Sequence, residues 1–341
     1  MSPQSSTPQS HPTLADVAAI AGVSVKTASR VLNESMNVSE VTAAKVQQAA
    51  NLLGYRSNRL ARELRTGTLS NLIGMIVSDL ANPFYAGLAS GAEEELSKNG
   101  LDLLLATSRD DGERERLLVD SLLERRVRGL IIVPSAEDYS YLHTERKRGV
   151  SIVFVDRPGP YLDADSVLSD NQGGIATCID RLIAQRCKSI ALIADNAKIW
   201  TASQRIEGFK RALLTRKLDP ASSPIVSEIH TIDLAEKAAR ELLLRKNPVD
   251  GIVASNDLIA IGVAHAVASL GAQCKVVSFD DFATSKLMNV PTLDHDPRRL
   301  GALAAESLMR RINNPTEKNF GEVLMKLSFR EEPIKAVTSN G

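Results

Sequence analysis

The chain has 341 residues, 43% of them hydrophobic and 24% charged, so it is long enough for two or three globular domains with buried cores. Its 41 basic and 41 acidic side chains cancel overall, but residues 1–66 carry a net charge of +3 and the remainder a net charge of −3. This asymmetry excludes a surface that is basic throughout and favours contact between nucleic acid and the N-terminal part alone.

Several segment types are absent from the sequence. Residues 1–12 are rich in Ser, Pro and Gln and lack the basic and apolar regions of a signal peptide, so we expect a disordered tail. No apolar run reaches the roughly 18 residues of a membrane span. The three cysteines are widely spaced without a C-x-x-C pair, which indicates free, partly buried thiols in a reducing cytoplasm. We therefore expect a cytoplasmic protein with no membrane partner.

Residues 13–33 predict two short helices joined by a tight turn. Thr13 and Asp16 have capping-box spacing before a helix at 14–20, and Ser24 precedes a second helix at 25–32. Gly22, between them, reaches the left-handed backbone region without steric cost. Such a pair forms a helix-turn-helix, whose second helix presents polar side chains to the DNA major groove. The alternative is an ordinary helical hairpin with a solvated charged face.

A third helix is predicted between Ser39 as its cap and Gly54 as its end. Its apolar side is expected to comprise Val41, Val46, Ala49, Ala50 and Leu53. The segment SNRLARELRTGT at 57–68 follows, with Ser57 as a cap and three arginines. Helix nucleation is too costly for so short a segment alone, so we expect it to fold only against a symmetry mate and DNA.

Two motifs in this region carry a family resemblance. T-L-A-D-V-A-x-x-A-G-V-S-x-x-T-x-S-R-V-L-N at 13–33 and N-x-x-A-R-x-L-R-T-G at 58–67 resemble the lactose/galactose repressor (LacI/GalR) family of bacterial transcription regulators. The resemblance implies base reading in the major groove by Val25, Lys26 and Arg30, and a hinge helix in the minor groove with Leu64 as a wedge. The residues expected at the DNA are Thr13, Ser24, Val25, Lys26, Thr27, Ser29, Arg30, Asn33, Asn58, Arg59, Ala61 and Leu64.

From residue 72 onward, short apolar runs alternate with helical stretches. One series of runs spans 72–77, 101–106, 130–133 and 151–155, and a second spans 190–194, 225–230, 251–254 and 276–279. Near-continuous apolar strands are typical of parallel sheets covered by helices on both faces. We therefore predict two doubly wound α/β lobes, with a ligand cleft where the carboxyl ends of their strands face each other.

Aromatic, carboxylate, amide and guanidinium groups follow these strands. Such a set suits a polyhydroxylated ring, because rings stack on its C–H faces while charged groups bond its hydroxyls. Singly, each has an ordinary explanation: Asn82-Pro83 as a turn, Asn256-Asp257 as a helix cap, Asp280-Asp281 as a turn. The residues expected to bind a small effector are Phe84, Tyr85, Asp156, Arg157, Trp200, Arg205, Asn256 and Asp280.

The body also resembles the family's effector domain, which shares its fold with periplasmic ribose- and galactose-binding proteins, in segments such as NPFYAGLASGAEEEL, SDNQGG and SNDLIAIGV. Asp156-Arg157 is similar to the pair that holds the sugar in ribose-binding proteins, which implies a ribose-like sugar or a nucleoside as effector. The expected domains are a tail at 1–12, a helix-turn-helix headpiece at 13–56, a hinge helix and linker at 57–69, an N-terminal lobe at 70–169 with 298–328, and a C-terminal lobe at 170–297 with 329–336.

No nucleotide-binding glycine motif, nucleophile elbow or zinc-protease motif occurs, and the five histidines are scattered. We therefore predict no catalytic residue, cofactor or metal. The favoured hypothesis is a repressor that binds a near-palindromic operator as a homodimer, because one recognition helix per chain makes too few base contacts. The alternative is a cytoplasmic sugar- or nucleoside-processing enzyme with an accessory helical domain, which would not need a basic head and hinge.

Overall fold

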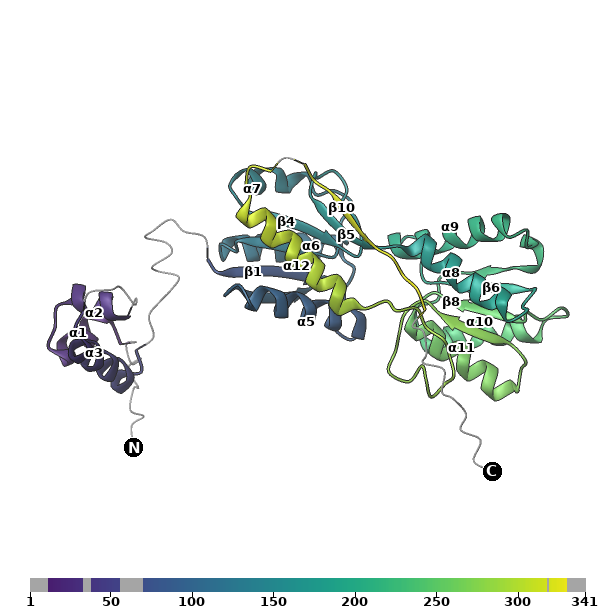
Figure 1. Cartoon of the computed structure of the whole chain (residues 1–341), viewed down its shortest axis with the longest axis horizontal. Helices are drawn as coiled ribbons and strands as arrows, with labels where there is room; N and C mark the ends of the chain where they lie inside the picture. The colour runs from purple at the N-terminus through teal and green to yellow at the C-terminus, as the bar shows by residue number, and fades with distance from the viewer. Residues whose placement is uncertain (1–11, 33–37, 56–69, 318, 330–341) are drawn as a thin grey trace, which may run out of the picture. The chain divides into compact units, whose positions relative to one another are not determined.

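A computed structural model of the chain describes residues 12–32, 38–55, 70–317 and 319–329. The chain divides into two compact units, with the division between Ser70 and Asn71. The N-terminal unit contains helices α1 (Leu14–Ala21), α2 (Val25–Leu32) and α3 (Glu40–Leu53) (Figure 1).

The predicted caps set the ends of these helices. Thr13 and Asp16 form the capping box of α1, and the backbone N–H of Thr27 donates to Ser24 Oγ at 3.0 Å. Gly22 and Gly54 follow α1 and α3 with φ of 65° and 63°, where a Cβ would be strained. The prediction for Val41 is wrong, since its side chain is 68% exposed. The buried core consists of small apolar residues: Val17, Ala18, Ala28, Val46, Ala49 and Ala50.

In the described part of the second unit, six parallel strands form the sheet of a first lobe, in the order β10-β5-β4-β3-β1-β2. Apolar side chains from both faces of this sheet are buried, which explains the continuous apolar runs. Helices α5 (Pro83–Ser97) and α12 (Pro297–Asn313) cover one face, as Figure 1 shows. The other face packs against α6 (Gly112–Glu124) and the segment that holds α7 (His143–Lys147). The strands are β1 (Leu72–Val77), β2 (Asp102–Thr107), β3 (Gly129–Ile132), β4 (Ser151–Val155), β5 (Asp165–Ser169) and β10 (Glu322–Met325).

Strands β5 and β10 were not predicted. Both lie at one side of the sheet, where β10 forms the edge, and β10 is only half-buried. The apolar runs of β5 (DSVLS) and β10 (EVLM) are only two and three residues long, so the pattern that identified the other strands does not detect them.

Four parallel strands form the sheet of a second lobe, in the order β7-β6-β8-β9. Helices α8 (Asn171–Ala184) and α9 (Trp200–Thr215) pack on one face, and α10 (Ile232–Leu244) and α11 (Asp257–Leu270) pack on the other. The strand predicted at 225–230 is shorter than expected because Glu228 has a φ of 66°, which is incompatible with an extended strand. The strands are β6 (Ile190–Ile193), β7 (Ile225–Val226), β8 (Gly251–Ala254) and β9 (Lys275–Ser278).

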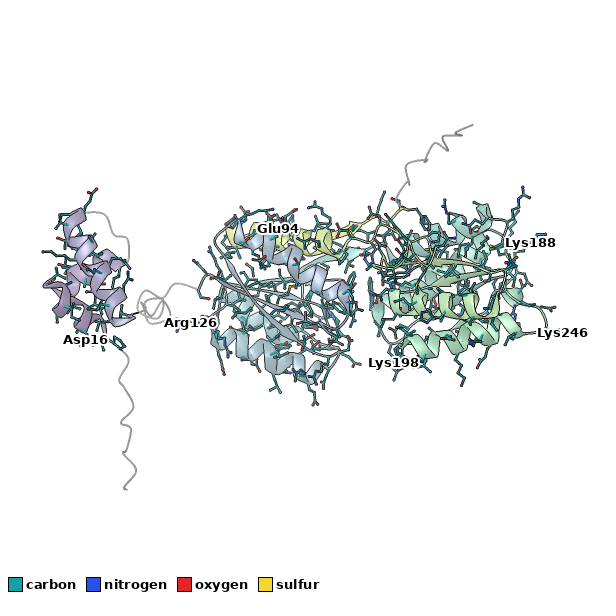
Figure 2. The ribbon with its side chains drawn as sticks, turned by 90° about the horizontal axis from the view of Figure 1, so that it is seen from below. Asp16, Glu94, Arg126, Lys188, Lys198 and Lys246 are labelled. Atoms are coloured by element: carbon teal, nitrogen blue, oxygen red, sulfur yellow. The ribbon has the colours of Figure 1, made fainter. Side chains whose placement is uncertain are left out.

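Three crossing segments connect the two lobes: the chain after β5, the chain before α12 and the chain after β10 (Figure 1). They bond to one another, since Asp170 N–H donates to the Met325 carbonyl at 2.9 Å and Asp294 N–H donates to the Ser328 carbonyl at 2.8 Å. Charged side chains such as Glu94, Lys188 and Lys246 point away from the body (Figure 2).

Two further sequence expectations concern thiols and membranes. All three cysteines are free and buried, more completely than predicted. Among the described residues, no helix has both the length and the apolar character needed to cross a bilayer.

Candidate functional site

A pocket of about 250 Å³ lies between the two lobes and is lined by residues from both. Each lining segment follows a parallel strand or belongs to the helix after it, so the carboxyl ends of both sheets face the pocket, as predicted. The lining residues are Ser78, Asp79, Asn82, Phe84, Tyr85, Asp110, Asp156, Arg157, Asp195, Ile199, Thr201, Ala202, Arg205, His230, Ser255, Asn256, Leu258 and Asp280.

On the first lobe, Asp156 and Arg157 follow β4 and form a buried ion pair, with Arg157 Nε 3.6 Å from Asp156 Oδ2. Asp156 has a φ of 69°, a strained conformation of the kind that persists at functional sites. The Arg157 guanidinium donates to Asp110 Oδ1 at 2.7 Å and to the Tyr85 hydroxyl at 3.1 Å, while its buried Nε has no hydrogen-bond partner among the described residues. Burial raises the pKa of Asp156, and the charge of Arg157 partly offsets this. The pair therefore offers a ligand a fixed guanidinium donor on Arg157 and a fixed carboxyl acceptor on Asp156.

On the second lobe, Arg205 of α9 and Asp280 after β9 form a matching pair, with Arg205 Nη1 3.6 Å from Asp280 Oδ2. The guanidinium of Arg205 stacks 3.8 Å from the centre of the Phe279 ring. Burial alone would raise the pKa of Asp280, but the charge of Arg205 and a hydrogen bond from His295 hold it below its usual value. Asp280 is therefore ionised at neutral pH and accepts hydrogen bonds.

Helix caps place the remaining pocket side chains. Asn82 caps α5 by accepting from Phe84 N–H at 2.9 Å, and Pro83 begins the helix, so Phe84 and Tyr85 fall on the first turn beside the pocket. Asn256 caps α11 by accepting from Ile259 N–H at 2.9 Å while its amide donates to Asp195 at 3.4 Å. Both asparagines thus cap a helix and also line the pocket.

The structure brings seven of the eight predicted effector residues to one pocket. Trp200 is the exception: it begins α9 but does not line the pocket, where Ile199 and Thr201 lie instead. Sequence reasoning did not select Ser78, Asp110 or His230, which lie at the pocket wall. Ser78 follows β1 directly and Asp110 lies three residues after the end of β2, so the rule that strand ends line the site would have identified them.

The pocket lining is acidic. It holds five aspartates and two arginines, a formal charge of −3 with His230 neutral. Each lobe contributes an Asp–Arg pair, and Phe84 adds an aromatic face. This arrangement can bind a neutral ring with several hydroxyls, since carboxylates accept from hydroxyls and guanidinium groups donate to them. It disfavours an anionic ligand.

The N-terminal unit presents a second candidate surface on α2. Val25, Lys26 and Arg30 are exposed, and Ala28 on the opposite side is fully buried against α1 and α3. Ser24 and Thr27 bond each other through their hydroxyls at 2.8 Å at the start of this helix. The predicted DNA contacts at Asn33, Asn58, Arg59, Ala61 and Leu64, and the cap at Ser57, lie outside the described residues.

Comparison with known proteins identifies both units. Residues 13–58 match the profile of bacterial regulatory proteins of the lacI family, and residues 70–328 match that of periplasmic binding proteins and the sugar binding domain of the LacI family.

Individual relatives cover nearly the whole chain. The ribose operon repressor of Halalkalibacterium halodurans is 31% identical over 94% of this chain and 96% of its own length. The ribose operon repressor of Bacillus subtilis is 32% identical over 87% and 90%. A crystal structure of the lac repressor dimer bound to operator and the anti-inducer ONPF is 26% identical, with a TM-score of 0.82 over 94% of this chain and 98% of that one.

Proposed function

This chain belongs to the LacI family of bacterial regulatory proteins, and we propose that it represses its target genes as a homodimer on a near-palindromic operator under the control of an uncharged, ribose-like sugar. The chain is a DNA-binding transcription regulator. Because the family acts on DNA, we place it in the cytoplasm and set the enzyme alternative aside. The observation that carries the effector proposal is the interlobe pocket, with an Asp–Arg pair on each wall.

The operator would be read by α2. Val25, Lys26 and Arg30 are exposed on this helix, and Arg30 has the donors to bond a guanine edge or a phosphate. One helix of 8 residues makes few base contacts, so two chains would read two half-sites related by a twofold axis. The other proposed contacts, including the Leu64 wedge in the hinge at 57–69, follow from the family resemblance.

An uncharged sugar fits the pocket better than a phosphorylated one. A formal charge of −3 on the lining opposes the approach of a phosphate, while two Asp–Arg pairs can bond neighbouring hydroxyls from opposite sides. The similarity to ribose operon repressors supports a ribose-like furanose. A nucleoside shares the furanose and is the second ligand to test.

Control requires that the effector bind the DNA-competent and DNA-incompetent states unequally. Contacts from both lobes to one ligand would favour one lobe arrangement over the other. The proposed hinge would then pass this difference to the headpiece, and Leu64→Ala is expected to weaken operator binding far more than sugar binding.

The test is footprinting on genomic DNA with and without D-ribose, ribose 5-phosphate and adenosine. We expect protection of a near-palindrome that changes with D-ribose and not with ribose 5-phosphate. Salt-sensitive binding with no preferred site would contradict the regulator proposal. A response to the phosphorylated sugar alone would contradict the proposed effector class, and recovery of an altered sugar would favour an enzyme.

A further inference from the structure

A ring of buried polar contacts, open at one link, lies behind the pocket. Arg205 Nε donates to Asn171 Oδ1 at 2.8 Å, and the Asn171 amide donates to the Ser169 carbonyl at 3.1 Å. Ser169 Oγ is 2.7 Å from His295 Nε2, and His295 Nδ1 is 2.7 Å from Asp280 Oδ1. Arg205 and Asp280 face each other across the open link, with Nη1 3.6 Å from Oδ2. We call Ser169, Asn171, Arg205, Asp280 and His295 the buried ring.

The buried ring joins two of the crossing segments to the pocket. Ser169 ends β5 and Asn171 begins α8, so these two residues flank the crossing at Asp170, and His295 belongs to the segment before α12, 126 positions from Ser169 along the chain. The His295 ring also lies between Phe84 of the first lobe and Phe279 of the second, with ring centres 5.0 and 5.3 Å away. A rotation of one lobe against the other must therefore disturb contacts of His295.

Hydrogen-bond chemistry fixes the direction of the contacts. A carboxylate can only accept, so the Nδ1–H of His295 donates to Asp280, and with a neutral imidazole the Ser169 hydroxyl donates to Nε2. The resulting Ser–His–Asp chain has the order found in hydrolases, but Ser169 is 1% exposed and does not line the interlobe pocket. A nucleophile has to reach its substrate, so this chain positions groups and does not attack one.

The longest link of the buried ring is the one that lines the pocket. Arg205 Nη1 and Asp280 Oδ2 are 3.6 Å apart, whereas the other four links measure 2.7 to 3.1 Å. A hydroxyl can accept from a guanidinium and donate to a carboxylate at the same time. A sugar hydroxyl in the pocket would therefore bridge the gap between Arg205 and Asp280.

We propose that an effector hydroxyl closes the buried ring, and that Ser169 and His295 act as positioning residues that couple this closure to the crossing segments between the lobes. This inference rests on the function proposed above. Asp280 and Arg205 hold the ligand, whereas the bond between Ser169 and His295 ties the end of β5, where one crossing begins, to the crossing segment before α12. Loss of that bond is expected to weaken the communication between pocket and operator more than the affinity for sugar.

Three variants of the full-length chain separate these roles. Ser169→Ala removes only the side-chain bond between the end of β5 and the crossing segment before α12. His295→Asn keeps a donor near the Nδ1 position, toward Asp280, but cannot reach Ser169. His295→Gln extends an amide toward Ser169 and loses the bond to Asp280. The probe is D-ribose, and the DNA is a duplex selected by the wild-type chain from a random library.

Two quantities are measured for each variant: the Kd for D-ribose by calorimetry, and the ratio of operator Kd values with and without saturating D-ribose. For Ser169→Ala and His295→Asn we expect a D-ribose Kd within about threefold of wild type and an operator ratio reduced by about fivefold or more. For His295→Gln we expect a D-ribose Kd raised by about tenfold, because the Asp280 carboxylate loses a charge-assisted bond.

Controls separate coupling from general damage. Ser108→Ala removes another fully buried hydroxyl, one that bonds Ser135 outside the buried ring, and should leave the operator ratio unchanged. Ser169→Thr restores a hydroxyl and should recover part of the ratio. If the wild-type chain responds to D-ribose and both Ser169→Ala and His295→Asn keep the full response, the role of the buried ring is refuted. The proposed effector would still stand. No effect of D-ribose on the wild-type chain would overturn the proposed effector together with this inference.

Discussion

Replacing Asp165 by Asn is expected to destabilise the first lobe strongly. Asp165 is 1% exposed and accepts two hydrogen bonds from Arg311, each at 2.6 Å, together with one from Arg310 at 2.9 Å and one from the Gly321 N–H at 2.8 Å. These bonds tie α12 to β5 and to the chain before β10. The variant would leave the buried Arg311 guanidinium without its nearest counter-charge, and only the more distant carboxylate of Glu317, 3.9 Å from Nη1, would remain.

The size of the effect follows from burial. Removing one partner of a buried ion pair costs about 3 to 5 kcal/mol, because the other charge stays buried and unpaired. For a unit of this size, that loss lowers Tm by roughly 6 to 15 °C. The matched control is Asp180→Asn, since Asp180 also accepts two bonds from one arginine, Arg216, at 2.5 and 2.6 Å, but its side chain is 59% exposed. An exposed pair contributes below about 1 kcal/mol.

The pH dependence provides a second check. Burial alone would raise the pKa of Asp165, but its bonds from Arg311, Gly321 and Arg310 hold that pKa below its usual value. A carboxylate with a depressed pKa stabilises the fold above its unfolded pKa, about 3.9, and loses this effect as the pH falls further. The gap in Tm between wild type and Asp165→Asn should therefore be full at neutral pH and shrink below about pH 4.

The assay is thermal unfolding of the full chain, followed by circular dichroism between pH 3 and pH 8. Equal Tm losses for Asp165→Asn and Asp180→Asn would refute the burial argument. A gap between wild type and Asp165→Asn that does not change with pH would refute the assigned ionisation.

Four further predictions concern the pocket, the DNA surface and the packing. Asp280→Asn and Arg205→Ala should abolish the D-ribose response in footprints while operator affinity stays within about threefold, since neither lies in the N-terminal unit. Arg30→Ala should lower operator affinity. If Arg30 contacts a phosphate, the variant should also reduce by about 1 the slope of the logarithm of the operator association constant against the logarithm of the salt concentration. An unchanged affinity would remove Arg30 from the interface. Gly301→Ala should cost roughly 1 to 3 kcal/mol in urea unfolding, because its Cβ would lie 1.9 Å from the Leu88 carbonyl oxygen of α5. Burial and the neighbouring Asp280 charge raise the pKa of Asp257 to about 6. Asp257→Asn should therefore raise Tm at pH 7.5 and have less effect at pH 4.5, where the wild-type carboxyl is protonated on folding. A lower Tm of the variant at pH 7.5 would contradict this.

Local patterns in the sequence determined where the headpiece helices begin and end. The ends of its helices depend on side chains within three or four positions, such as the Thr13 and Asp16 capping box and the glycines that follow α1 and α3. The pocket residues were predictable for a similar reason. Parallel strands covered on both faces read as apolar runs, and their carboxyl ends meet at one edge, so seven of eight selected residues reached the same pocket without knowledge of which strands are neighbours.

Only the tertiary structure decided which way a side chain faces and which distant groups meet. Trp200 follows β6 as expected, yet Ile199 and Thr201 line the pocket, because the orientation of α9 selects the residues that face inward. Val41 has apolar character, yet its side chain is 68% exposed among the described residues. His295 and Ser169 are 126 positions apart, and each belongs to a segment whose pattern is unremarkable by itself. Their bond exists because the fold brings the end of β5 beside the crossing segment before α12, and residue spacing along the chain does not predict that contact.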